Sequence, residues 1–382
     1  METVKLGLLI KKTKVARCGE HSYPVLSITK QDGIIMQSEK FKKRIASADT
    51  SDYKIIPRGK LVQGIHIDEG NFGIQDIVDN GIVSPAYGVW DVNDGLVIPK
   101  YLEMVLRSPK SIEFYRSKLT GTVNRRGHMS DADFLSMDIP LPDRDTQSKI
   151  LKTMKQTTSV LYSRQQQLAK LDELIKARFV EVFGDMLLNS LEWPEKSLES
   201  LADIVSGITK GRKTTETELI EVPYMAVSNV KSGYIDWTTV KTILATKQEI
   251  EQYRLMPDDI LMTEGGDPDK VGRGAIIKNP LKDSIHQNHI FRVRLDKSEL
   301  LPAYFAEYLQ HQKAKRYFLG CAKQTTGIAS INMRQLRALP VLIPPLSLQN
   351  QFAAFVAEVD KSKLFAELFA QNACILAENR SK

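Results

Sequence analysis

The sequence contains few cysteines and no long apolar run. Its 382 residues include three cysteines, Cys18, Cys321 and Cys374, which lie far apart and form no Cys-x-x-Cys pair. We therefore expect neither a disulfide framework nor a zinc site, and a reducing cytoplasm fits this composition. No apolar run reaches the length of about eighteen residues that a membrane-spanning helix needs. The N-terminus, Met1 to Lys5, lacks the apolar core of a signal peptide.

Motifs of catalytic sites are also missing. There is no Asn/Asp-Pro-Pro-Tyr/Phe motif of a methyltransferase, and the one nuclease-like triplet, Asp52-Tyr53-Lys54, follows no Pro-Asp. Gly265-Gly266 and Gly272-Arg273-Gly274 lack the Lys-Ser/Thr of a phosphate loop, so we interpret them as turns. His286 and His289 lie in a β-rich run, where side chains three residues apart point to opposite faces. We expect no catalytic site, no cofactor and no metal.

The net charge of +7 is modest and spread along the chain. Segments 1–142, 143–185, 186–343 and 344–382 carry +3, +2, +2 and 0, respectively. This excess permits a polyanionic partner without requiring one.

A long helix is predicted for residues 143–185. The segment contains no Gly or Pro before Gly184, and Pro142 lies just outside its start. Its apolar residues recur at steps of four and three, which is the 3.5-residue period of a coiled coil. They are Ile150, Met154, Leu161, Leu168, Leu171 and Ile175, and Thr157, Arg164 and Arg178 interrupt them. We expect this helix to be one strand of a two-helix spacer.

The chain repeats itself at an interval of about two hundred residues. Four blocks recur in the same order at offsets of 200 to 203. Tyr53–Pro57 with Leu61 matches Tyr253–Pro257 with Leu261, and Gly33 matches Gly233. Ile98–Leu102 matches Leu301–Phe305, and Pro142 with Gln147 matches Pro344 with Gln349. We therefore predict two copies of one domain, each followed by its helix.

Each copy is predicted to begin with mixed α/β structure. β-rich runs such as Tyr23–Ile28, Gly81–Val92 and Ile285–Leu295 lie between turn clusters. Helices are expected at Pro99–Tyr115 and Pro302–Phe318, each opened by a proline.

A second long helix is predicted from Gln349 to about Glu378. Its seam includes Phe352, Phe355, Val359 and Phe369. Two seams in a duplicated chain favour an antiparallel coiled coil with a pseudo-twofold axis. The alternative is two separate amphipathic helices, each packed on its own domain.

Several motifs resemble the specificity (S) subunit of type I restriction–modification systems. Leu168–Asp185, followed by Trp193-Pro194, resembles the central region of that family. Ile343–Gln349 resembles its Pro-Pro-Leu-x-x-Gln helix start, and Gly81–Tyr87 resembles a strand motif of its target-recognition domains. The first helix start departs from the pattern, since Pro142–Gln147 lacks the second Pro and the Leu. The second helix stops at Lys382 without a counterpart of Arg178–Gly184, from which we expect a shorter contact surface.

The resemblance implies an α+β chain in which two target-recognition domains, 1–142 and 186–343, are joined by spacer helices 143–185 and 344–382. It implies a non-catalytic subunit whose domains each read one half of a bipartite double-stranded DNA target. The spacer would set the gap between these halves. Two methyltransferase subunits would bind it, and restriction subunits could join them.

Basic and polar clusters are the candidate DNA-binding residues, because Lys and Arg neutralise phosphates and Arg or Asn read base edges. They are Lys42, Lys43, Arg44, Asn124, Arg125, Arg126, Lys210, Arg212, Lys213, Arg273, Asn332 and Arg334. The alternative for each is a solvated charged loop. Two other functions remain open for the whole chain: a coiled-coil scaffold that binds only protein, and a single-chain DNA-modifying enzyme with unrecognised motifs.

Overall fold

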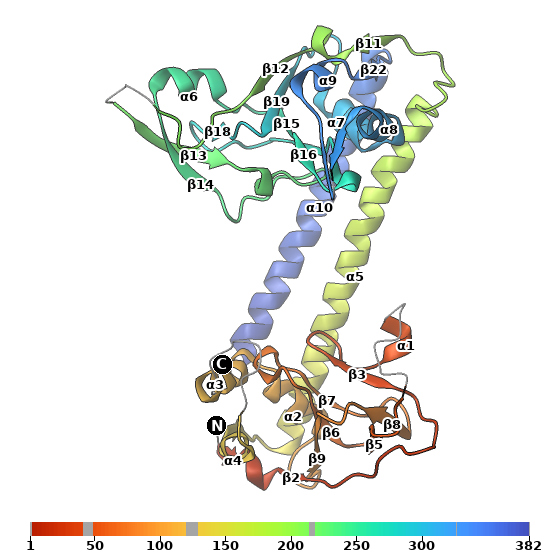
Figure 1. The fold of residues 1–382 in the computed structure, drawn as a ribbon, viewed down its shortest axis with the longest axis vertical. Coiled ribbons are helices and arrows are strands. Elements are labelled where there is room, and N and C mark those ends of the chain that lie inside the picture. Colours follow the sequence, from red (N-terminus) through yellow and green to blue (C-terminus); the bar gives the residue numbers. More distant parts are fainter. Residues whose placement is uncertain (1, 41–48, 120–128, 214–217, 326, 382) are drawn as a thin grey trace. The chain divides into compact units, whose positions relative to one another are not determined.

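The computed structural model describes residues 2–40, 49–119, 129–213, 218–325 and 327–381, without the side chains of Asp269, Gln324, Thr325 and 369–381. The chain forms two compact units, Met1–Leu161 with Ala373–Lys382, and Tyr162–Asn372. The two long helices, α5 (Arg144–Phe183) and α10 (Leu346–Ser381), each contribute residues to both units (Figure 1). Ile150 near the start of α5 packs against the core of unit 1, whereas Phe183 at its end and Phe352 near the start of α10 belong to the core of unit 2.

Unit 1 is built on a four-stranded antiparallel sheet in the order β2-β9-β6-β7, formed by Ile10–Lys12, Gly88–Val92, Leu61–Gln63 and Phe72–Ile74. Two further strand pairs are β3 (Leu26–Thr29) with β4 (Gly33–Met36) and β5 (Lys54–Pro57) with β8 (Asn80–Val83). β1 (Thr3–Lys5) pairs with β10 (Asp138–Pro140), which immediately precedes α5. Short helices α1 (Gln37–Lys40) and α4 (Asp131–Leu135) complete the unit.

Unit 2 contains a four-stranded antiparallel sheet in the order β12-β19-β15-β17, formed by Ala202–Ser206, Ile290–Leu295, Ile260–Thr263 and Gly274–Ile276. A second sheet has the order β14-β13-β18, from Lys241–Ala245, Ile220–Met225 and Ile285–His286, with α6 (Lys247–Tyr253) beside β18. A third joins β16 (Gly265–Gly266), β21 (Ile328–Ser330) and β20 (Lys323–Thr325). β11 (Glu195–Ser197) pairs with β22 (Pro340–Leu342), which precedes α10. Both units thus have mixed α/β content.

Two segments predicted as single helices are each broken into two. They are α2 (Pro99–Leu106) with α3 (Pro109–Lys118), and α7 (Pro302–Gln310) with α8 (Gln312–Cys321). The break in unit 1 has a local cause, because Ser108 caps α3 by accepting a hydrogen bond from Ser111 N at 3.3 Å. Pro109 also lacks the N–H that a continuing helix would need. In unit 2, His311 Nδ1 accepts from Lys313 N at 3.3 Å. Gly81–Val92 and Ile285–Leu295 likewise form two strands each.

The two long helices pack against each other within unit 2. The rings of Phe183 and Phe352 lie with centroids 5.5 Å apart, and Lys363 forms an ion pair with Asp172 at 2.5 Å. From the first pair to the second, the residue number falls by 11 on α5 and rises by 11 on α10. The helices therefore run antiparallel over these residues.

Most residues expected at the seam are partly or fully buried. Ile150 packs against the core of unit 1, whereas Leu171, Ile175, Phe352, Phe355 and Val359 belong to or pack against the core of unit 2. Leu161 and Leu168 are half-buried. Met154, also predicted at the seam, is 40% exposed, and its neighbour Thr153 is less exposed. An ideal α-helix drifts by about 20° per heptad from a 3.5-residue repeat, so one apolar residue can leave the seam. The side chain of Phe369 lies outside the described part.

Matching glutamines hold the start of each long helix. Gln147 Oε1 accepts from Ile98 N at 2.8 Å, and its Nε2 donates to Pro142 O at 2.8 Å and Leu96 O at 3.5 Å. In unit 2, Gln349 accepts from Leu301 N at 2.8 Å and donates to Pro344 O and Glu299 O at 2.8 and 3.0 Å. Both side chains are fully buried. Each glutamine thus satisfies the same three backbone groups at offsets of 202 or 203.

Candidate nucleic-acid interface

The structure describes only part of the candidate DNA-binding set. Lys42, Lys43 and Arg44 lie outside the described residues, as do Asn124, Arg125 and Arg126. The remaining candidates all belong to unit 2: Lys210, Arg212, Lys213, Arg273, Asn332 and Arg334. The hydrogen bonds and ion pairs of each side chain show whether it is available to a phosphate or already bound to another part of unit 2.

Three of these candidates follow β12 in the loop at 209–213. Arg212 is engaged: its Nε donates to Glu249 Oε1 at 2.5 Å, and its Nη2 donates to Glu249 Oε2 and to Leu244 O. The hydrogen bond from Arg212 holds the pKa of Glu249 below its usual value. Lys210 and Lys213 are exposed and form no ion pair within the described part of the chain. Arg212 therefore anchors the loop, and the two lysines are available to an anion.

Arg273 lies at the end of the loop between β15 and β17. Its backbone is fixed, since Arg273 N donates to Lys270 O at 3.2 Å and Thr263 N donates to Arg273 O at 3.1 Å. Its Nε is buried and has no hydrogen-bond partner among the described residues. Part of this guanidinium group is thus desolvated, so the side chain has less freedom to reach a base than an exposed loop arginine.

The last two candidates belong to α9 (Met333–Arg337). Asn332 is the N-cap: its Oδ1 accepts from Gln335 N at 2.9 Å, and Gln335 Oε1 accepts from Asn332 N at 2.8 Å. This is the reciprocal arrangement of a capping box, so the Asn332 side chain already has a structural role. Ser130 has the corresponding position in unit 1, where it caps α4. Arg334 is exposed and without an ion pair in the described ranges.

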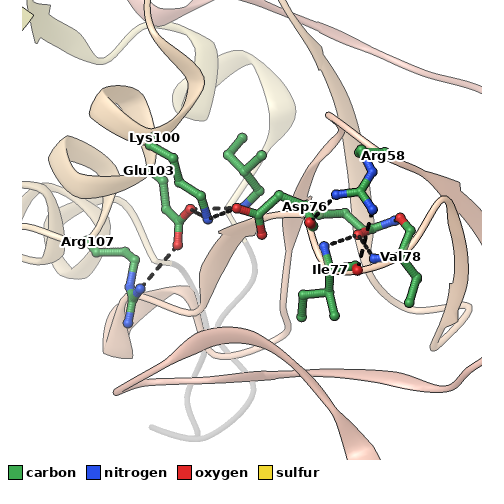
Figure 2. A network of polar contacts seen from close by, with 9 residues as sticks. Arg58, Asp76, Ile77, Val78, Lys100, Glu103 and Arg107 are labelled. Atoms are coloured by element: carbon green, nitrogen blue, oxygen red, sulfur yellow. Dashed lines mark hydrogen bonds and ion pairs between the residues drawn. The ribbon is translucent and has the colours of Figure 1, made fainter. Parts of the chain in front are cut away.

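A polar network that the sequence analysis missed joins α2 to the turn at 75–79 of unit 1, where Lys100 forms an ion pair with Asp76 at 3.1 Å (Figure 2). The buried carboxylate of Glu103 accepts from Ile74 N at 3.1 Å, from Lys100 at 2.9 Å and from Arg107 at 3.2 Å. Burial alone would lower the pKa of Lys100, but Glu103 and Asp76 outweigh it, and the pKa lies above its usual value. The spacing of Lys100, Glu103 and Arg107 along one helix face was the available signal.

Arg107 carries this network to the turn between β3 and β4. Its Nη2 donates to Lys30 O and Gln31 O, both at 2.8 Å. In unit 2 the matching position is Gln310, whose Oε1 accepts from Ser232 Oγ at 2.5 Å. Both turns contain a glycine in the left-handed region, Gly33 at φ 71° and Gly233 at φ 84°. A side chain at the C-terminal end of α2 in unit 1, and of α7 in unit 2, therefore binds a turn of its own unit.

The two histidines of the His-x-x-His spacing have unrelated surroundings. His286 is fully buried, with Nδ1 3.3 Å from Tyr253 O and Nε2 3.4 Å from Val205 O. Burial lowers its pKa to about 4. His289 is largely exposed, and its Nδ1 lies 2.5 Å from Glu264. Within the described ranges, no three His, Cys, Asp or Glu side chains gather as metal ligands. No helix in those ranges has the length and apolarity to cross a membrane.

Residues 190–368 match the family model of the type I restriction modification DNA specificity domain. Among curated proteins, the chain is 28% identical over 171 residues to the putative type I restriction enzyme MjaX specificity subunit of Methanocaldococcus jannaschii, covering 44% of this chain and 40% of that protein. It is 21% identical to the type I restriction enzyme EcoKI specificity subunit of Escherichia coli K12, covering 61% of this chain and 52% of the relative. The chain thus spans about half the length of these relatives.

Solved structures share the fold across almost the whole chain. One, described in work on complex assembly and conformational transition of the type I R-M system, has a TM-score of 0.56 at 16% identity. The S subunit of the type I restriction–modification system from M. genitalium has a TM-score of 0.53 at 13% identity. Each comparison covers 99% of this chain and 94% of the other. At these identities the likeness concerns the fold alone.

Proposed function

We propose that the chain is the sequence-reading subunit of a type I restriction–modification complex, since residues 190–368 match the family model of the type I restriction modification DNA specificity domain. In this proposal it binds double-stranded DNA in the cytoplasm. Target-recognition domains within units 1 and 2 each read one half of a bipartite target. The chain places the DNA and carries out no catalytic step itself.

The observation that carries this proposal is the internal repetition of structure. Gln147 and Gln349 make the same three hydrogen bonds at the start of the two long helices. Tyr101 and Tyr304, 203 residues apart, donate to Pro140 O at 3.0 Å and Leu342 O at 2.8 Å. The pair β1–β10 likewise matches β11–β22. Two similar domains suit a target with two specified halves.

The two long helices suit a spacer between the half-sites. The antiparallel contacts from Phe183–Phe352 to Asp172–Lys363 support a coiled coil with a pseudo-twofold axis. A stretch of about thirty residues at 1.5 Å each measures roughly 45 Å. Half-sites one DNA turn apart are separated by about 34–36 Å. A rigid helix pair of this length is therefore able to set the gap.

We assign the partners from the exposed sides of the helices. Leu364, Phe365 and Leu368 on α10 are 57%, 65% and 47% exposed, and Tyr162 and Leu174 on α5 are 62% and 47% exposed. Large apolar side chains in water favour a protein partner. In the proposed complex these surfaces receive two methyltransferase subunits, which supply the catalytic step, and restriction subunits can join them.

The proposal is tested by sequencing methylated DNA motifs in cells with and without this chain. We expect a bipartite motif that disappears when the chain is deleted and returns when it is restored. The purified chain should co-purify with a methyltransferase subunit and should methylate no DNA alone when given S-adenosylmethionine. Methylation by the rigorously purified chain would instead favour the single-chain enzyme. A complex whose affinity for duplex DNA does not depend on salt would favour the protein-binding scaffold.

A further inference from the structure

Unit 2 contains a long segment without any acidic residue. Between Glu307 and Glu358 there is no Asp or Glu, whereas six cations occur: Lys313, Lys315, Arg316, Lys323, Arg334 and Arg337. The segment includes α8, β20, β21 and α9. The matching segment of unit 1, at 106–155, contains ten cations and six acidic residues, so its net charge is +4 against +6. Both segments are basic, but only that of unit 2 lacks acidic residues that could pair with its cations.

Packing brings these cations to one part of unit 2. Tyr317 on α8 donates to Gln335 O on α9 at 2.8 Å, and Gln335 Nε2 donates to Cys321 O at the end of α8. One cation is neutralised, since Lys313 pairs with Glu195 at 2.8 Å and is mostly buried. The other five are exposed and have no ion pair within the described residues. They thus retain their charge toward solvent.

Two glycines of unit 2 are not required by packing against the described residues. A Cβ added to Gly320 near the end of α8 would meet nothing within 4 Å, and one added to Gly266 in β16 would lie 3.8 Å from its nearest neighbour. Neither glycine has a backbone in the left-handed region. Gly272 nearby contrasts with both, because its φ is 69° and an added Cβ would clash with Phe318. A glycine in a helix costs about 1 kcal/mol relative to alanine, so Gly320 weakens α8 with no gain inside the fold.

Gly320 shares a helix face with one of these cations. Arg316 and Gly320 are four residues apart on α8 and therefore lie one turn apart on the same side. Lys323 in β20 is paired in register with Ser330, and Ser330 is paired with Gly265 in β16. Gly265 therefore lies on the face of Lys323, whereas Gly266 points to the opposite face. The open backbone at Gly320 beside Arg316 suits a closely approaching polyanion, because a missing side chain leaves room for the ligand.

We propose that Arg316, Gly320, Lys323, Arg334 and Arg337, here named the α8–α9 surface, receive the phosphate backbone of duplex DNA. The inference rests on the proposed DNA binding and adds the face of unit 2 that makes the backbone contacts. Phosphate contacts fix the register and orientation of a protein on DNA without reading its sequence.

The charge test compares two double variants of the full chain in complex with its methyltransferase subunits. Arg316→Ala with Lys323→Ala removes two cations of the surface. Lys241→Ala with Lys282→Ala removes two exposed lysines elsewhere in unit 2 that form no ion pair in the described part of the chain. Each lost phosphate contact flattens the slope of log affinity against log salt by about 0.9. Between 50 and 200 mM salt, the wild type should lose about twelvefold more affinity than the surface variant. The control should keep the wild-type slope.

The glycine test separates binding from folding. Gly320→Ala should raise or preserve the thermal unfolding midpoint, since alanine favours helices and the site is open, yet it should weaken duplex binding. Equal slopes for the surface variant and the wild type, with unchanged binding by Gly320→Ala, would overturn the α8–α9 surface. Salt-dependent binding by the wild type would then leave the proposed function standing. A wild-type complex that binds no duplex would instead refute the proposed function itself.

Discussion

At the residue scale, ionic partners separate the lysines of the loop at 209–213 from its arginine. Arg212 donates through Nε and Nη2 to Glu249, whereas Lys210 and Lys213 have no ion pair among the described residues. A cation that is already paired gains less from a phosphate than a free one, because its first partner must be given up. A triple substitution of this loop would therefore mix loss of stability with loss of binding.

We predict that Lys210→Ala with Lys213→Ala leaves stability unchanged and flattens the salt slope of duplex binding by about 1.8 if both lysines contact phosphate. Arg212→Ala should instead lower the free energy of unfolding by about 1–2 kcal/mol, because it removes charged hydrogen bonds. Urea unfolding and a salt-titrated duplex-binding assay measure the two effects. A flatter slope in Arg212→Ala with unchanged stability would mean that the ion pair with Glu249 is not formed in solution.

His286 makes the stability of unit 2 dependent on pH. Its folded-state pKa of about 4 lies below the ordinary value of 6.5, so the unfolded chain binds more protons between these values. Stability then rises with pH, and acidification from pH 6.5 to 5 should cost roughly 1.5 kcal/mol through this group. His286→Gln should show a shallower decline over that interval in urea unfolding. An identical decline in both proteins would assign the pH dependence to other groups.

At the scale of elements, the joint between each domain and its long helix depends on one buried amide. Gln349 pairs with the N–H of Leu301 and with two carbonyl groups, those of Pro344 and Glu299. Leu301 and Glu299 precede Gln349 by 48 and 50 residues, and Pro344 lies just before the start of α10. The side chain therefore fixes the direction in which α10 leaves the domain.

We predict that Gln349→Leu lowers the free energy of unfolding by about 3 kcal/mol or more, because it leaves a buried N–H and two carbonyls unpaired at about 1–3 kcal/mol each. Gln147→Leu should have a similar effect in unit 1. Gln351→Leu is the matched control, since Gln351 is exposed two residues farther along α10. Chemical denaturation of the full-length variants measures the difference. Equal stability of Gln349→Leu and Gln351→Leu would show that the joint is not held by this amide.

At the scale of the whole molecule, the proposed spacer predicts a change in the DNA target. Seven residues inserted into each helix, between Arg164 and Leu168 and near Ala366, preserve the register of the seam. The insertion lengthens the helix pair by roughly 10 Å, which is about three base pairs. Both half-sequences should remain unchanged, and the gap between them should grow. Methylome sequencing with the variant and its methyltransferase partner gives the result. Full activity at the original gap would mean that the helices do not set the distance.

The sequence by itself determined features that depend on neighbouring residues. The long helix expected at 143–185 was found at Arg144–Phe183, because the absence of Gly and Pro and the regular apolar spacing act locally. Asn332 and Gln335 also carry a local signal, since their spacing is that of a capping box and would have identified Asn332 as a cap. Ser108-Pro109 could likewise have located the break between α2 and α3.

Only the tertiary structure decided which polar groups are available to a partner. Arg212 is neutralised by Glu249, 37 residues away, and Glu103 accepts from Ile74 N, 29 residues away. The α8–α9 surface likewise depends on the contact of Tyr317 with Gln335 and on the pairing of β16 with β21. Local propensities cannot specify such pairs, because the energy of a charge depends on which distant groups the fold brings within a few ångströms of it.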